Sequence, residues 1–510
     1  MVTEVSTGGE GHPGSIDIQP LMRQNFLEYA SYVIVDRAIP EIRDGFKPVQ
    51  RRILATLWNM HDGRFHKVAN VIGDTMKLHP HGDASIGDAL VVLANKGYFI
   101  ERQGNFGNVI TGHRAAAARY IECRLTPLAR ETLFHPELTQ KQPSYDGRKE
   151  EPVRLPAKLP VILLLGIEGI AVGMSTRILP HNFCELLLAQ IKLLKKEPIE
   201  LFPDFPHGGL VDVSEYDDGR GRVKVRAKIE ADGPKKVVIR EIPYGTTTES
   251  LIASLENATT KGKVKIGSIQ DFTTDRVEIQ IDLPRGATAA ETIPQLYAYT
   301  DCEVSLNSAL TVIRDRHPAD LSVTEILTDC TKDLKAQLKA ELELELEKLD
   351  DKKHWLTLEQ IFIEQRVWQR LERAKTDASV RKEVWDGMQE NALLFVRPMT
   401  EDDVDRLLKI HIRRISAYDI ARYRAQMQEI DAAIKVARSK LRNLTKTTIA
   451  YLEGLLVTYG RDWPRRTQIG TFESVDKKAV SLQNIKVTFD PDSGFIGSAV
   501  KSGARTFSMS

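Results

Sequence analysis

Residues 67–95 read KVANVIGDTMKLHPHGDASIGDALVVLAN, and this stretch decides the fold of the N-terminal part of the chain. Apolar residues recur at helical spacing over residues 67–77 and again over residues 84–95. Between these helices HPHGD is a turn sequence, and its Asp83 can cap the second helix. A helix, a Gly-containing turn and a helix in this order predict a helix-turn-helix unit. Two further helices are expected upstream, over residues 21–38 and, after Pro48, over residues 49–60.

The residues that follow favour a β wing. Gly104, Gly107 and Gly112 stand among polar and aromatic residues between Gly97 and Gly112, as a short pair of strands requires. Tyr120 comes just beyond this predicted wing. Because a winged helix places a helix in the major groove of DNA, Tyr120 would lie close to a phosphate backbone.

Further along, the pattern changes twice. Strand-like alternation begins at Arg222 and returns at residues 237–239 and 277–281, with a helical stretch near Leu251, which predicts a separate α+β domain. From Leu321 the chain becomes helical and charged, and its predicted partner helix carries a heptad seam formed by Ile420, Tyr423, Met427, Ile430, Ile434, Ala437, Leu441 and Leu444. Two long helices far apart in sequence, each apolar along one stripe, predict an antiparallel coiled coil.

Length and composition set the class of protein. At 510 residues the chain should divide into several domains, and its 42% hydrophobic and 28% charged residues suit a globular protein. No apolar stretch approaches the roughly twenty residues of a membrane span, and the polar first residues are not a signal peptide, so a cytoplasmic location is expected. Four widely spaced cysteines fit neither a disulfide framework nor a zinc site, and we interpret them as packing residues: Cys123, Cys184, Cys302 and Cys330.

The distribution of charge points to local contacts with an anion. A net charge of +1 argues against a protein that coats DNA through a general excess of cations. One cluster nevertheless stands out, formed by Arg37, Arg43, Lys47, Arg51 and Arg52. A Tyr hydroxyl, with a pKa of about 10, is a poor nucleophile at neutral pH, so Tyr120 would need cations such as Arg119 beside it.

Short motifs occur in one order along the chain: YA (29–30), DRAIP (36–40), RDGFKPVQRR (43–52), HPHGD (79–83), QGNFG (103–107), AAAARY (115–120) and GIAVGMST (169–176). This ordered set resembles the breakage-reunion region of the A subunits of the bacterial type IIA DNA topoisomerases, which are topoisomerase IV and gyrase. The resemblance extends over about residues 20 to 470.

The resemblance implies a multidomain α+β fold. Its parts would be a flexible tail (1–15), a winged-helix DNA-gate domain with the catalytic Tyr (16–150), an α/β tower domain (151–320), coiled-coil arms (321–354 and 416–460), a small helical exit-gate dimerisation domain at their tip (355–415) and a partial C-terminal β segment (470–510).

It also implies roles for individual residues. Tyr120 would attack the scissile phosphate and stay bonded to the 5′ end, with Arg119 stabilising the transition state. Arg37, His79 and His81 would belong to the catalytic surround, while Lys47, Arg51 and Arg52 would hold the gate duplex. Ile170 would insert between base pairs to bend the DNA. Without the resemblance, Ile170 would be interpreted as core packing.

Metal and nucleotide are expected on another chain. The sequence contains no convincing acidic constellation and no P-loop. In the family that it resembles, a B subunit carries the Mg²⁺-binding acidic domain and the ATPase. The expected assembly is therefore an A2B2 heterotetramer on double-stranded DNA at the nucleoid. Two copies of this chain are needed because each Tyr cuts one strand.

Several residues depart from the family pattern, among them His113, Ala118 and Leu165. Ala84 stands where quinolone-sensitive members carry a serine, although Asp88, the acid of that drug site, is present. We therefore expect a weak quinolone response. Potent drug-induced DNA cleavage at low concentration would contradict this expectation.

The choice between a topoisomerase IV subunit and a gyrase subunit depends on one feature of the sequence. The Gln-Arg-Arg-Gly-Gly-Lys-Gly box of the gyrase A subunits is absent, which favours relaxation and decatenation over supercoiling. Three alternatives stay open: a gyrase A subunit without its wrapping domain, a non-catalytic architectural DNA-binding dimer with the same fold, and a winged-helix transcription regulator. The combination of Tyr120, Arg119 and Arg37 favours an enzyme.

Overall fold

The computed structural model describes residues 18–274, 276–410, 420–472, 485–489, 496–497 and 505–509. The predicted tail (1–15), residues 411–419 and most of the predicted C-terminal segment lie outside these ranges. Backbone contacts divide the chain into two compact units, Met1–Thr331 with Leu456–Ser510, and Lys332–Leu455. No helix of the described residues has the length and the low charge that a membrane crossing requires.

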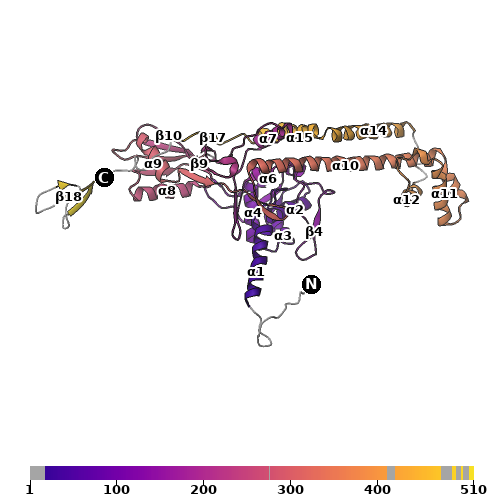
Figure 1. Ribbon diagram of the computed structural model, residues 1–510, viewed down its shortest axis with the longest axis horizontal. Coiled ribbons are helices and arrows are strands. Elements are labelled where there is room, and N and C mark those ends of the chain that lie inside the picture. Colours follow the sequence, from indigo (N-terminus) through magenta and orange to yellow (C-terminus); the bar gives the residue numbers. More distant parts are fainter. Residues whose placement is uncertain are drawn as a thin grey trace, which may run out of the picture. The chain divides into compact units, whose positions relative to one another are not determined.

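The predicted N-terminal helices form with small changes of boundary (Figure 1). They are α1 (Ile18–Val33), the π-helix η1 (Ile34–Ala38), α2 (Pro48–Asn59), α3 (Val68–Thr75) and α4 (Asp83–Asn95). The predicted cap of α4 is wrong, because Gly82 holds the N-cap position and Asp83 is the first helical residue. At this position the negative charge of the Asp83 carboxylate still interacts favourably with the positive end of the helix dipole.

The wing differs from its prediction. Its sheet has the order β1-β3-β2 and is antiparallel, with strands β1 (His66–Lys67), β2 (Ile100–Gln103) and β3 (Glu122–Leu125). Residues 104–121 connect β2 to β3 as a loop. Gly104, Gly107 and Gly112 in this loop have positive φ, which interrupts regular strand pairing. Tyr120 therefore ends the wing loop, two residues before β3, and does not lie beyond the wing.

The predicted α+β region contains two four-stranded sheets. One has the order β10-β11-β13-β12, with β10 (Lys228–Ala231), β11 (Lys236–Glu241), β12 (Ser268–Asp271) and β13 (Ile279–Asp282). The other has the order β14-β9-β8-β17, with β8 (Leu210–Asp212), β9 (Arg222–Arg226), β14 (Glu303–Asn307) and β17 (Gln468–Ile469). Strand β17 pairs in parallel with β8. The chain thus returns to the first unit after the second unit and adds the last strand of this sheet.

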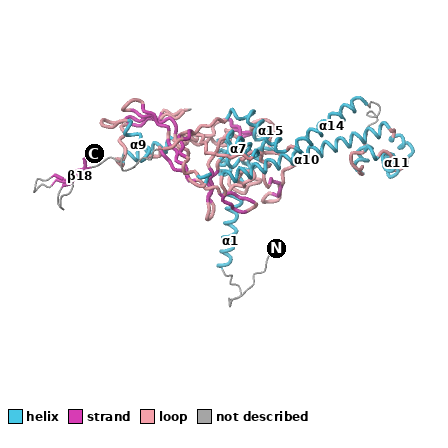
Figure 2. The backbone as a smooth tube through the Cα atoms, turned by 45° about the horizontal axis from the view of Figure 1, so that its top comes forward, coloured by secondary structure: helices cyan, strands magenta, loops and turns pink. Residues whose placement is uncertain are grey.

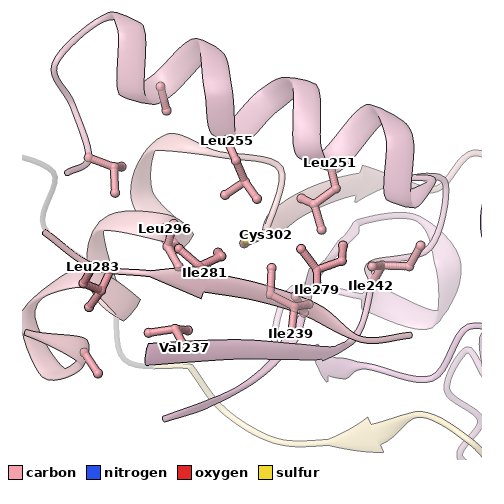
Figure 3. Packing of buried hydrophobic residues seen from close by; sticks show 14 of the residues in the cluster. Val237, Ile239, Ile242, Leu251, Leu255, Ile279, Ile281, Leu283, Leu296 and Cys302 are labelled. Carbon is pink, nitrogen blue, oxygen red and sulfur yellow. The ribbon is translucent and has the colours of Figure 1, made fainter. Parts of the chain in front are cut away.

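Two helices accompany these sheets, α8 (Thr248–Thr260) and α9 (Ala289–Tyr299). Figure 3 shows Leu251 and Leu255 of α8 above Ile279 and Ile281 of β13, and all four side chains are fully buried. The sequence predicted α8 but not α9, because Pro294 inside α9 normally counts against a helix interior.

The first unit also contains further short elements. They are β4 (Lys141–Pro143), β5 (Glu150–Pro152), β6 (Ile167–Ile170), β7 (Ser175–Ile178), β15 (Thr311–Arg314), β16 (His317–Asp320), α5 (Pro127–Thr132), α6 (Val161–Leu165) and α7 (Phe183–Lys195). None of the four cysteines forms a disulfide, and Cys123, Cys302 and Cys330 are buried, as a packing role requires, whereas Cys184 is partly buried.

The second unit is helical. Its elements are α10 (Val323–Glu364), η3 (Val367–Arg373), α11 (Asp377–Gln389), η4 (Ala392–Leu394), α12 (Glu401–Leu408), α14 (Ile420–Arg442) and α15 (Leu444–Tyr459), of which α10 begins and α15 ends in the first unit. Helix α10 continues to Glu364, past the predicted end of the arm at residue 354.

Helices α10 and α14 lie side by side (Figure 2). The ammonium nitrogen of Lys353 lies 2.6 Å from Asp431 Oδ1, and that of Lys335 donates to Thr445 Oγ1 at 2.8 Å. Lys335, earlier in α10, contacts Thr445 after the end of α14, whereas Lys353, later in α10, contacts Asp431 within α14. The two helices therefore run antiparallel. Tyr423, Ile430 and Ile434 of the predicted seam are buried and cluster with Leu356 of α10.

Candidate functional site

An open groove of about 710 Å³ in the first unit collects five of the predicted site residues. Its lining includes Arg37, Lys47, His79, His81 and Ile170. These residues come from η1, from the residue before α2, from the turn between α3 and α4, and from the β6–β7 hairpin. The fold thus brings together side chains that are far apart in sequence, and most of the charge that they contribute is positive.

His79 is held neutral at the wall of the groove. Arg52 Nη1 lies 2.8 Å from His79 Nδ1, and the same guanidinium makes two hydrogen bonds to Glu151, at 2.5 and 2.9 Å. A guanidinium can only donate, so Nδ1 accepts and the proton of the neutral ring resides on Nε2. Burial, followed by the positive charge of Arg52, lowers the pKa of His79 to about 4.

The lowered pKa of His79 predicts that acid destabilises this region. Between the ordinary value of 6.5 and about 4, the unfolded chain binds a proton at His79 and the folded chain does not. Stability should therefore fall as the pH is lowered through this window. We expect the melting temperature of the wild type to fall more between pH 7 and pH 5 than that of His79→Gln. In the control His113→Gln, which removes an exposed imidazole, the melting temperature should fall as much as in the wild type. An equal fall in His79→Gln would contradict the role given to His79.

His81 lies next to His79, with 4.6 Å between the ring centroids. Its Nε2 is 2.7 Å from the hydroxyl of Tyr32, a residue of α1 that the sequence did not identify. The groove therefore carries two imidazoles in different surroundings. His79 is buried and anchored to an arginine, whereas the partner of His81 is an exposed phenol.

Lys47 and Ile170 also line the groove. The Lys47 ammonium donates to the Glu168 carbonyl at 2.5 Å, and burial lowers its pKa while Glu168 opposes the shift. Ile170 is 87% exposed, so the interpretation as core packing is wrong. An exposed isoleucine at the end of a hairpin strand beside a cationic groove leaves the predicted role as a wedge open.

Arg51 requires a correction. Its guanidinium is buried and pairs with Asp44, Nε to Oδ2 at 2.5 Å and Nη2 to Oδ1 at 2.9 Å. Asp44 is also completely buried and accepts from the backbone N–H groups of Phe46 and Leu155. Arg51 therefore supports α2 from within and is not available to hold a duplex. Arg52, the next residue of α2, is only partly buried and contacts Glu151 and His79 instead.

Tyr120 and Arg119 lie elsewhere in the same unit. Tyr120 is 64% exposed, and the Arg119 guanidinium lies over its ring, 4.5 Å from the centroid. The backbone of Ala118 and Ile121 accepts hydrogen bonds from Ala69 and Val68, at the start of α3. His79 and His81 follow the other end of α3, a distance on the order of 10 Å along the axis of an eight-residue helix. Tyr120 is not part of the groove lining in one chain.

Ala84 and Asp88 line a different cavity, of about 770 Å³, between α4 and the wing loop. Two of the departures from the family pattern, His113 and Ala118, line it as well. Leu165, the third, is buried at the end of α6. The quinolone prediction stays a prediction.

The carboxylates of the groove do not fit a metal centre. The groove lining contains Asp36 and Glu168, and Glu168 is paired with Arg177 at 2.8 Å. Within the described ranges no three His, Cys, Asp or Glu side chains are grouped so that they could hold a metal ion. We therefore derive no chemical step through a metal on this chain.

Sequence reasoning missed Tyr32, Asp44 and Glu151. Asp44 belongs to one of the recognised motifs, and its place among basic residues was a signal that it neutralises one of them. Glu151 lies 99 positions after Arg52. No local pattern connects the two, and only the folded chain reveals this pair.

Comparison with known proteins identifies the family of the chain. A family model that describes the A subunits of DNA gyrase and topoisomerase IV matches residues 37–453. The chain is 46% identical over 488 residues to the A subunit of DNA topoisomerase 4 from Borreliella burgdorferi, covering 96% of this chain and 78% of that protein. It is 39% identical over 342 residues to the DNA gyrase A subunit of Lawsonia intracellularis, covering 61% and 42%. For the DNA gyrase A subunit of Deinococcus deserti the identity is 33% over 460 residues, covering 84% and 55%.

The similarity is therefore more extensive to a topoisomerase IV protein than to these gyrase proteins, of which the chain spans about half the length. This favours the topoisomerase IV interpretation over a shortened gyrase, an architectural dimer or a transcription regulator. The chain belongs to the family formed by the A subunits of DNA gyrase and topoisomerase IV, the type II DNA topoisomerases.

Proposed function

We propose that this chain is the strand-breaking and rejoining subunit of a topoisomerase IV-like enzyme that relaxes and decatenates DNA at the nucleoid, in the cytoplasm. The observation that carries the proposal is the cationic groove together with an exposed Tyr120 under the Arg119 guanidinium. In this proposal the wing and α2–α4 form the DNA gate, the two sheets form the tower, and α10 and α14 lead to an exit gate.

The proposed reaction is a transesterification. Tyr120 Oη attacks phosphorus and loses its proton, an O–P bond forms, and the bond from phosphorus to the 3′ oxygen breaks while that oxygen takes up a proton. The reverse step reseals the strand. Arg119 and Arg37 supply positive charge for the pentacoordinate transition state, and Lys47 holds the duplex. His81 is suited to move a proton, since its Nε2 already shares one with Tyr32.

Mg²⁺ and ATP belong to the proposed partner, a topoisomerase B subunit with ATPase and Mg²⁺-binding domains. The groove of this chain offers cations and few free carboxylates. An A2B2 heterotetramer on double-stranded DNA is therefore the proposed working form. The direct test is decatenation of linked DNA circles by this chain mixed with its B subunit, ATP and Mg²⁺. Unlinking supports the proposal, and DNA binding without unlinking contradicts it.

We further infer that each complete site uses two copies of this chain, since Tyr120 and the groove lie at opposite ends of α3. Mixed dimers test this inference. One copy carries Tyr120→Phe and the other Arg37→Ala, and two different affinity tags isolate the mixed form. If Tyr120 works with the groove of the other copy, one of the two sites is intact and the dimer nicks one strand.

The reciprocal mixed dimer is the control. A copy with both Tyr120→Phe and Arg37→Ala, paired with an unchanged copy, should then cleave neither strand. If Tyr120 instead uses the groove of its own chain, the two results exchange: the first dimer is inactive and the second nicks DNA.

A further inference from the structure

A second cavity of the first unit, of about 430 Å³, is separate from the groove. It is lined by the end of α4, the start of the wing loop, the segment after α7 that includes Phe205 and His207, and residues 462–466. No step of the proposed cleavage reaction uses it. Three cations line it, Lys96, Arg102 and Arg466, together with the aromatic rings of Tyr98 and Trp463.

Lys96 is the most unusual of these residues. It follows α4 as the C-cap residue, and burial lowers the pKa of its ammonium group. Among the described residues it has no salt bridge and no side-chain hydrogen bond. Glu168, whose charge opposes the shift, is paired with Arg177. A half-buried ammonium group without a counter-charge is costly, and native proteins usually supply a partner.

His207 presents a second polar atom without a partner. Its Nδ1 is buried and has no hydrogen-bond partner in the described part of the chain, while its Nε2 is 3.4 Å from the Val109 carbonyl. Lys96, His207 and Arg466 all line the cavity, and the positive charges of Lys96 and Arg466 both act on this ring.

The carboxylates of the lining do not neutralise these groups. Asp204 accepts from the backbone N–H groups of Arg466 and Thr467, at 3.0 and 2.9 Å, and from the Asn182 amide at 3.0 Å. Its charge is thus used to hold the segment after α15 in place. Asp462, the other carboxylate, is exposed and forms no salt bridge with Lys96.

We propose that this cavity, which we call the Lys96 cavity, binds a small phosphate-bearing molecule. Phosphate oxygens accept hydrogen bonds from ammonium and guanidinium groups, and a protonated phosphate oxygen can donate to an imidazole nitrogen. One such group would give Lys96 a counter-charge, with Arg466 and His207 beside it in the lining. The smaller volume and the surrounding aromatic rings favour a free small molecule over the backbone of a duplex.

Calorimetric titration of the full chain with inorganic pyrophosphate, without DNA or B subunit, tests this proposal. We expect saturable binding that Lys96→Met weakens at least about tenfold. Lys192→Met, which removes an exposed lysine from the last turn of α7, should bind as the wild type does. Lys47→Met, in the groove, should also leave the affinity unchanged.

Three results would overturn the proposal: no saturable binding, equal affinity in Lys96→Met, or a loss in Lys47→Met that matches the loss in Lys96→Met. The last result would place pyrophosphate in the DNA groove. Displacement of pyrophosphate by a short duplex would be a fourth, because it would assign the site to the DNA backbone. Because the assay measures binding alone, its failure leaves the decatenation test of the proposed function untouched.

Discussion

Tyr120→Phe is expected to abolish covalent DNA cleavage and to lower decatenation by at least about 10³-fold, because it removes the attacking oxygen and nothing else. The phenyl ring still fits beneath the Arg119 guanidinium, which lies 4.5 Å from the ring centroid in the wild type. DNA binding should therefore persist. The measurement is trapping of protein joined to the 5′ end of cleaved DNA, with the B subunit, ATP and Mg²⁺ present.

Tyr145→Phe is the matched control, since Tyr145 is also exposed, at 59%. That variant should cleave as the wild type does. A covalent complex that survives in Tyr120→Phe would mean that another residue is the nucleophile. Loss of DNA binding in Tyr120→Phe would instead mean that the hydroxyl is needed to bind DNA, before the chemical step.

Asp44→Asn is expected to destabilise the region around α2 by about 3–5 kcal/mol, because it leaves the buried Arg51 guanidinium without a counter-charge. Asp44 is fully buried and accepts two hydrogen bonds from Arg51 and two from backbone N–H groups. Hydrogen exchange of peptides from α2 measures the effect locally, which is suitable for a chain of several units.

An exposed pair of the same chemistry provides the comparison. Arg43 and Asp315 lie 2.9 Å apart with side chains 36% and 70% exposed, so Asp315→Asn should cost about 1 kcal/mol or less. The double variant Asp44→Asn with Arg51→Met should recover part of the loss, because it removes the unpaired charge. Equal costs at Asp44 and Asp315 would contradict the burial argument.

Much of the local structure was predictable from sequence. Apolar spacing predicted α2, α3 and α4 to within a few residues, and alternation predicted β9, β11 and β13. These patterns succeed because one face of each element must be buried, whatever the element packs against. Prediction failed where a glycine or a proline acts in an unusual context, as in the wing loop and at Pro294 of α9.

The sequence by itself determined the family, the order of the elements and the residues that could carry chemistry, because motifs and periodicity are local and survive without coordinates. Only the tertiary structure decided which cations are free. Arg51 and Arg52 are neighbours in sequence, yet one is buried on Asp44 and the other joins Glu151 to His79. The partners of such charges come from segments that meet only when the chain folds, and burial then determines whether a charge faces a ligand or is neutralised inside the protein.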